Sequence, residues 1–140
     1  MPRAGTKGYR KYDISKDRYL ELSHKAKQYP TWKQLVDGLQ DTARAITYSD
    51  MPKAPQVTGS PTEDAAIKIA ELTTKIDKVE RSITLACDAY PTAYKYLLAN
   101  ITLGSTPDEL ESQWGLMPCG RNKFYDMRSK AFFLMHLEFQ

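Results

Sequence analysis

The chain is poor in the residues from which metal centres and disulfide frameworks are built. Its 140 residues include two cysteines, Cys87 and Cys119, and two histidines, His24 and His136. The cysteines form no paired motif, and the histidines lie far apart in the sequence, outside any zinc-ligand pattern. We therefore expect no metal and no cofactor. Free thiols are the simplest interpretation of the cysteines, although the sequence leaves a disulfide between them open.

Long apolar runs and the motifs of common enzymes are also missing. No run approaches the roughly 18 apolar residues that a membrane-spanning helix needs, and residues 1–11 do not lead into a signal peptide. There is no Gly-rich phosphate loop and no nucleophile elbow. The acidic pairs Glu63-Asp64 and Asp108-Glu109 lie at expected helix starts, where the helix dipole explains them without catalysis. We expect a cytoplasmic protein without membrane contact or enzymatic activity.

Basic residues are concentrated near the N-terminus. The formal net charge is only +3, but the first eleven residues contain four basic residues and no acidic one. Such a segment is typical of a flexible arm that can lie along a DNA backbone. We expect residues 1–14 to form this arm, with an unstructured terminus of no specific role as the alternative.

Apolar residues at helical spacing are abundant, and there is no strand pattern, so we expect an all-α fold. A first helix is expected over Ser15–Gln28, interrupted by Pro30. A second helix restarts at the capping signal Thr31-Trp32-Lys33-Gln34, and its apolar residues recur at four- and three-residue steps: Trp32, Val36, Leu39, Ala43 and Ile46. Residues 48–60 are rich in proline and polar residues, which predicts a loop.

The longest expected helix begins at the capping signal Ser60-Pro61-Thr62-Glu63. Its apolar residues keep the same rhythm: Ala65, Ile69, Leu72, Ile76, Val79, Ile83 and Ala86. An apolar stripe of this kind must be covered by another surface. We therefore expect residues 15–87 to form an antiparallel, coiled-coil-like helical hairpin, in which the stripe of the longest helix packs against the Trp32–Ile46 helix. An intermolecular coiled coil, as in a homodimer, is the alternative.

Residues 88–140 predict a small helix-turn-helix head. A scaffold helix over Thr92–Asn100 precedes a helix that begins with a capping box at Thr106 and ends at Gly115. The last helix is expected over Gly120–Leu137, with an apolar stripe of Phe124, Met127, Ala131, Leu134 and Met135. Residues near its start fall mostly off this stripe, where a recognition helix contacts base edges: Arg121, Asn122, Lys123, Tyr125, Arg128 and Ser129.

The order of these segments resembles the ArpU/RinA-like transcriptional regulators encoded by phages of Gram-positive bacteria. The residues that carry the resemblance are Tyr96-Leu97-Leu98, Leu103-Gly104-Ser105-Thr106-Pro107-Asp108-Glu109-Leu110 and the segment from Pro118 to Lys130. It covers most of the chain from about Asp13 onward. In that group the C-terminal part is similar to the helix-turn-helix of sigma-factor region 4. The chain departs from it at Cys119-Gly120, where Ser or Thr often begins the second helix, and in a longer turn over residues 115–118.

The resemblance implies that DNA is contacted by Arg121, Asn122, Lys123, Tyr125 and Arg128, with Lys130 on a phosphate. We therefore expect a phage regulator, for example a late-gene activator, that binds double-stranded DNA. Host RNA polymerase and a second copy of the chain are further expected partners. A small terminase subunit for DNA packaging, and a protein-interaction module that inhibits a host factor without DNA, stay open as alternatives.

Overall fold

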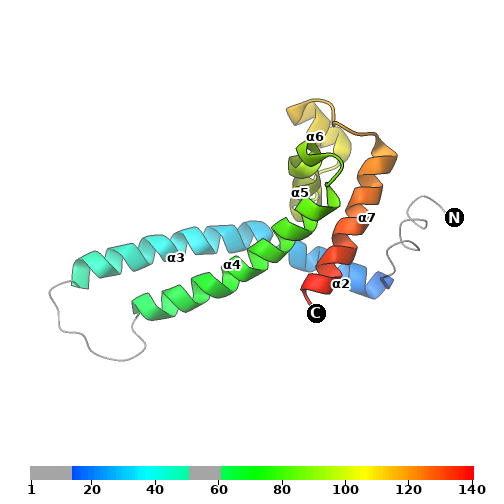
Figure 1. Cartoon of the computed structure of the whole chain (residues 1–140). Coiled ribbons are helices and arrows are strands. Elements are labelled where there is room, and N and C mark those ends of the chain that lie inside the picture. Colours follow the sequence, from blue (N-terminus) through cyan, green and yellow to red (C-terminus); the bar gives the residue numbers. More distant parts are fainter. Residues whose placement is uncertain (1–13, 51–60) are drawn as a thin grey trace. The chain divides into compact units, whose positions relative to one another are not determined.

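Every regular element of the described residues is helical, which confirms the expected all-α fold. The computed structural model describes residues 14–50 and 61–140, with side chains at 14–41 and 63–140. The helices, shown in Figure 1, are α2 (Lys16–Ala26), α3 (Tyr29–Asp50), α4 (Pro61–Ala86), the 3-10 turn η1 (Pro91–Ala93), α5 (Tyr94–Leu103), α6 (Pro107–Trp114) and α7 (Arg121–Glu138). None of these helices is long and apolar enough to cross a membrane. The expected basic arm and most of the expected loop, residues 1–13 and 51–60, lie outside the described residues.

Contacts divide the chain into two units, and each is described by itself. The larger unit combines Met1–Tyr29 with Lys78–Gln140, and the smaller unit is Pro30–Asp77. The expected boundary between hairpin and head, at residues 87 and 88, stays a prediction. Within the larger unit, α2 packs against α5 and α7.

In the smaller unit, α3 and the first part of α4 run in opposite directions (Figure 1). The predicted stripe faces inward: Trp32, Leu72 and Ile76 are buried. Val36, Leu39 and Ile69 are half-buried. The Lys75 ammonium lies 5.7 Å from the centre of the Trp32 ring, which places the two helices in contact at this level. Ala65 is also buried, whereas Val79, Ile83 and Ala86 belong to the core of the larger unit. The side chains of the remaining stripe residues, Ala43 and Ile46, lie outside the described ones.

The boundaries of α3 differ from those expected. The helix begins at Tyr29, so Pro30 lies in its first turn instead of interrupting it, and Thr31 is no cap. Proline is tolerated there because the first N–H groups of a helix have no intrahelical partner. The helix also continues to Asp50, so the prediction that a loop starts at residue 48 placed the end of this helix too early.

The larger unit is built around α5, which packs against α2, α6 and α7. Its core consists of almost fully buried apolar side chains from all of these helices and the end of α4: Leu22, Val79, Ile83, Leu97, Ile101, Leu110, Phe124, Phe132 and Met135. Phe132 was not part of the predicted stripe, and Leu20 of α2 is 43% exposed. The core fixes one face of α7 against its neighbours.

Local caps set the ends of several of these helices, and the capping box that the sequence predicted at Thr106 is present. Ser15 precedes α2, and its Oγ accepts the Arg18 N–H at 3.1 Å. Thr106 and Glu109 form the reciprocal capping box of α6, with hydrogen bonds of 2.8 and 3.2 Å. Gly104 ends α5 with φ of 79°, a conformation that favours glycine.

The C-terminal end of α7 is anchored by two arginines from distant parts of the chain. Arg18 Nε donates to His136 Nδ1 at 2.9 Å, and its Nη2 reaches the carbonyl oxygens of His136 and Phe139. Arg81 makes a two-pronged contact with Glu138, both hydrogen bonds being 2.9 Å long. This pairing lowers the pKa of Glu138. The last turn of α7 is therefore tied to both α2 and α4.

Candidate nucleic-acid interface

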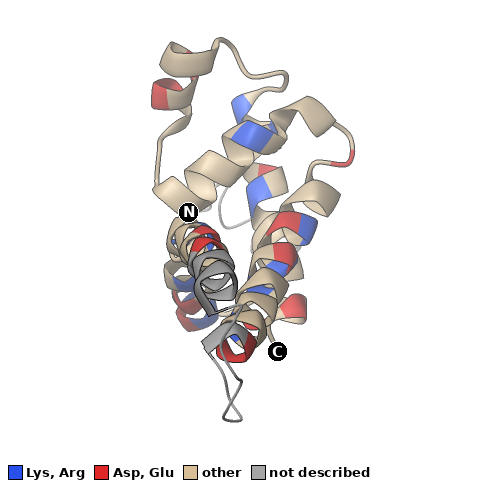
Figure 2. Ribbon diagram, turned by 90° about the vertical axis from the view of Figure 1, so that its left-hand side faces the viewer, with Lys and Arg blue, Asp and Glu red and all other residues tan. Residues whose placement is uncertain are grey.

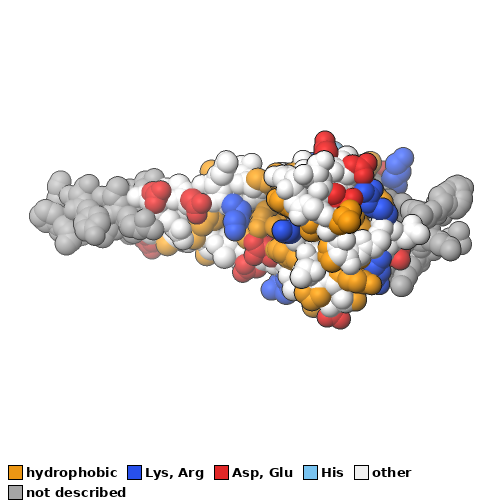
Figure 3. All heavy atoms as spheres, turned by 90° about the horizontal axis from the view of Figure 1, so that it is seen from above, with side chains coloured by type: hydrophobic (Ala, Val, Ile, Leu, Met, Phe, Trp, Pro, Cys, Tyr) orange, Lys and Arg blue, Asp and Glu red, His pale blue; other side chains and the backbone are white. Residues whose placement is uncertain are grey.

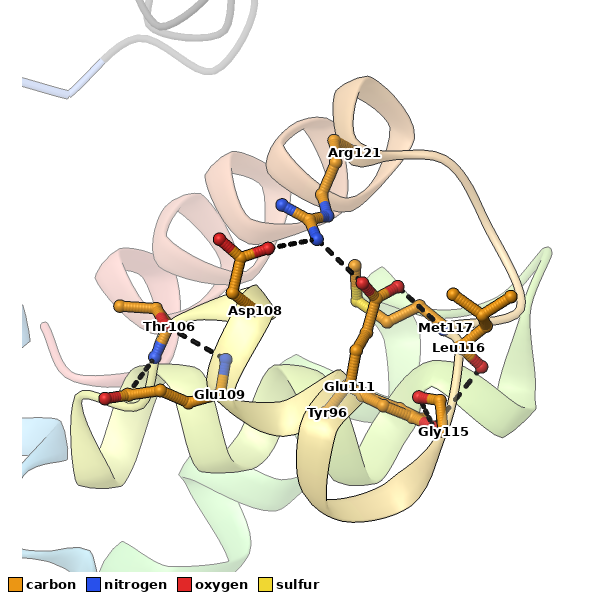
Figure 4. A network of polar contacts seen from close by, with 9 residues as sticks. All are labelled: Tyr96, Thr106, Asp108, Glu109, Glu111, Gly115, Leu116, Met117 and Arg121. Carbon is orange, nitrogen blue, oxygen red and sulfur yellow. Dashed lines mark hydrogen bonds and ion pairs between the residues drawn. The ribbon is translucent and has the colours of Figure 1, made fainter.

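The turn between α6 and α7 is held by hydrogen bonds to its backbone. The Tyr96 hydroxyl on α5 contacts the carbonyl oxygen of Gly115 at 2.9 Å (Figure 4). The Met117 N–H donates to Glu111 Oε2 at 3.0 Å, and the Met117 side chain is buried. Gly115 has φ of 94°, a region that residues with a Cβ rarely adopt. The backbone of this turn therefore has fixed hydrogen-bond partners.

Arg121, the first residue of α7, points back toward α6 (Figure 4). Its Nη2 lies 2.7 Å from Asp108 Oδ1 and 2.7 Å from Glu111 Oε1. The hydrogen bond with Asp108, followed by the one with Glu111, raises the pKa of Arg121 above its ordinary value. The pKa of Glu111 is lowered, chiefly because its carboxylate accepts the Met117 N–H and then because of Arg121. Arg121, the first of the predicted DNA contacts, is therefore already paired with two carboxylates of the protein itself.

Three other predicted DNA contacts are exposed on the first turns of α7. Asn122 and Lys123 are exposed, and Tyr125 is 44% exposed. Within the described part of the chain, neither Asn122 nor Lys123 makes a side-chain hydrogen bond or ion pair. Phe124, which lies between Lys123 and Tyr125, and Met127, which follows them, are buried against the core. The helix thus presents polar groups on one side while its other side is fixed.

Arg128, one turn further on, is held inside the larger unit. Its Nε donates to Asn100 Oδ1 at 2.7 Å, and its guanidinium lies 5.0 Å from the centre of the Phe132 ring and 5.6 Å from that of Tyr19. These contacts join α2, α5 and α7. Lys130 and Ser129 are half-buried. The structure therefore divides the predicted set: Asn122, Lys123 and Tyr125 are exposed, whereas Arg121 and Arg128 are engaged within the protein and Ser129 and Lys130 are half-buried.

Beside the turn lies a contact between a basic and an aromatic side chain that the sequence pattern did not predict. Lys95 Nζ on α5 lies 5.1 Å from the centre of the Trp114 ring and 5.6 Å from that of Tyr96. Trp114 is 38% exposed, and Leu116 in the turn is 84% exposed. Leu110 and Trp114 are four residues apart, and this spacing alone predicts that Trp114 lies on the buried face of α6 with Leu110. A tryptophan at the last residue of a short helix is poorly placed for full burial, and this position is the signal in the sequence that could have predicted an exposed Trp114.

Both cysteines are free thiols. Burial raises the pKa of Cys87 to about 11, and burial also raises the pKa of Cys119. Neither thiol therefore has the lowered pKa of a reactive nucleophile. Among the described residues, no group of histidine, cysteine and carboxylate side chains is placed to hold a metal ion.

Acidic and basic residues are interspersed along the helices, as Figure 2 shows. On the face drawn in Figure 3, basic side chains are scattered among acidic and apolar ones without one continuous basic field. On that face, then, the charge pattern alone does not mark out a nucleic-acid surface. The candidate interface rests instead on particular side chains at the start of α7.

Comparison of the chain with protein-family models, with curated proteins and with solved structures finds no match in any of the three.

Proposed function

We propose that the protein is a phage-encoded transcriptional regulator that binds double-stranded DNA, with α6 and α7 as a helix-turn-helix and α7 in the major groove. The observation that carries the proposal is the start of α7, where Asn122, Lys123 and Tyr125 are exposed while the opposite face is buried. A recognition helix needs this division, because it must be held rigidly while its first turns contact bases.

The chemistry of the three exposed residues suits a groove contact. An asparagine amide can pair with the N6 and N7 edge of adenine, and a lysine can donate to guanine or to a phosphate. The Tyr125 ring is stacked edge-on against the buried Phe124, with the ring centres 5.6 Å apart, so its position is restricted. Its hydroxyl is then available to a phosphate oxygen.

We propose that the smaller unit makes the contact with a second copy of the chain or with RNA polymerase. Its helices cover their apolar stripe within the chain, but Leu35 is 47% exposed and Ile67 is 56% exposed. Two exposed aliphatic side chains on this unit suit a protein contact. A helix-turn-helix dimer contacts two half-sites, so dimerisation would double the DNA contacts.

Binding to a pool of duplexes with a randomised centre tests this function. Repeated selection on the full-length protein should enrich one sequence, and fluorescence anisotropy should show that the enriched duplex binds more tightly than a scrambled one. Affinity for both should fall as salt rises, since phosphate contacts release counterions. No enrichment together with no binding at low salt would refute DNA binding.

A protein-binding role is the second candidate, and one observation favours it. Trp114, the last residue of α6, and Leu116 in the turn are both exposed, and exposed aromatic and aliphatic side chains suit a contact with a protein surface. Under this alternative, substitutions at Trp114 would abolish function and substitutions at Lys123 would not.

A further inference from the structure

Arg121 occupies an unusual position for a DNA-contacting arginine. It is the first residue of α7, where the helix dipole disfavours a positive charge, and Gly120 before it supplies no side-chain cap. The two α6 carboxylates that it contacts compensate for both features, since they bring negative charge to this helix start (Figure 4). The arginine therefore serves as the link through which α6 stabilises the beginning of α7.

The local charge also argues against a phosphate at Arg121. One guanidinium faces two carboxylates, so the three groups together are negative. Asp108 is the outermost of them, with its side chain 84% exposed, whereas the Glu111 side chain is 20% exposed. A phosphate approaching Arg121 from solvent would come close to Asp108 and be repelled. Lys123, two residues later, has no such acidic partner among the residues described.

Glu111 connects Arg121 to the turn. One of its carboxylate oxygens accepts from Arg121 and the other accepts from the Met117 N–H. Removing the guanidinium would leave Glu111 with a single partner and free it to rotate away from Met117. The turn would then lose the hydrogen bond between Met117 and Glu111, which restrains its backbone. The direction in which α7 starts would be less well fixed as a result.

We propose that Arg121 is a positioning residue, which holds α7 at its start through Asp108 and Glu111, and that DNA is contacted by the neighbouring Asn122, Lys123 and Tyr125. The part of this inference that concerns DNA rests on the proposed function. The part that concerns the turn does not, because it can be measured on the protein alone.

The test compares Arg121→Ala with Lys123→Ala in the full chain, using two measurements. Amide hydrogen exchange of the free protein should show faster exchange at Met117 in Arg121→Ala and no change in Lys123→Ala. In duplex titrations over a range of salt concentrations, Lys123→Ala should lower the slope of log affinity against log salt by about 0.9, the value of one phosphate contact. Arg121→Ala should weaken binding but keep the wild-type slope.

Arg121→Lys provides the matched variant, because it keeps the charge and cannot bridge both carboxylates in the same planar geometry. We expect it to lose Met117 protection, as Arg121→Ala does. Unchanged Met117 exchange in both Arg121 variants would overturn the positioning role. A reduced salt slope in Arg121→Ala that Arg121→Lys restores would overturn the exclusion of Arg121 from the DNA. Wild-type protein that binds no duplex would refute the proposed function and leave the exchange result standing.

Discussion

The two ends of α7 use the same kinds of side chain for different purposes. At the C-terminal end, Arg18 and Arg81 fasten the helix to α2 and α4, and Phe132 and Met135 are buried. At the N-terminal end, Arg121 is tied to α6 and Phe124 is buried, whereas Asn122 and Lys123 remain exposed. One end is an anchor and the other is available to a partner. A charged residue on a helix is therefore informative about binding only once its partners within the protein are known.

The largest expected effect comes from breaking the anchored end. Phe132→Ala should lower the free energy of unfolding by about 3–5 kcal/mol, because a fully buried ring leaves a cavity. Chemical denaturation measures the loss. Tyr125→Ala, at the exposed end, is the control and should cost far less. Equal losses in the two variants would mean that α7 is not divided as described.

Arg128→Ala tests whether that residue belongs to the anchored end. The variant loses the hydrogen bond to Asn100 and the contacts with the Tyr19 and Phe132 rings, so we expect unfolding to become easier by about 1–2 kcal/mol. Arg128→Lys should not recover this loss, since an ammonium lacks the planar stacking surface. If Arg128→Ala were as stable as the wild type but deficient in DNA binding, Arg128 would be a DNA contact and not part of the anchored end.

Thr106→Ala examines the support that α6 gives to the start of α7. Removing the capping hydroxyl leaves the Glu109 N–H without its partner, and the loss should be about 1 kcal/mol. Thermal denaturation measures it, with Thr106→Ser, which keeps the hydroxyl, as the control. If Thr106→Ser were as destabilised as Thr106→Ala, the hydrogen bond would not be the cause.

The smallest effect is the pH dependence of the Glu111 contacts. Because the pKa of Glu111 in the folded protein lies below its ordinary value of 4.5, its contribution to stability is present above that value and is lost as pH falls through the folded one. Thermal denaturation of Glu111→Gln should show a deficit against wild type at neutral pH that shrinks in acid. A deficit that is constant at all pH values would show that the charge of Glu111 is not involved.

Most of the helices and the capping box at Thr106 were predictable because their causes are local, whereas the cap expected at Thr31 is absent. The spacing of Ile76, Val79 and Ile83 and the capping box at Thr106 are legible over a few residues of sequence. The contacts that decide which charges are available are not local. Arg18 and His136 are 118 residues apart, and Arg128 meets an asparagine on a different helix. The spacing of apolar residues in the sequence places such a charged residue on a particular face of its helix. It does not show which side chains of other helices pack against that face.

The candidate site shows the same limit on a smaller scale. The sequence placed Arg121, Lys123 and Arg128 on the polar side of α7, and all three looked equivalent. Arg121 is engaged because α6 happens to direct two carboxylates at it, and Arg128 because two aromatic rings and Asn100 surround it. Only tertiary contacts distinguish Lys123 from its neighbours.

The central claim, that the start of α7 contacts DNA, is tested most directly by one titration. The double variant Asn122→Ala Lys123→Ala and the control Lys130→Ala would be compared with wild type for binding to a labelled duplex at low salt, with denaturation curves to establish that all three are folded. We expect the double variant to bind the duplex much more weakly than the wild type, and Lys130→Ala to lose less affinity. Undiminished affinity in a folded double variant would contradict the central claim.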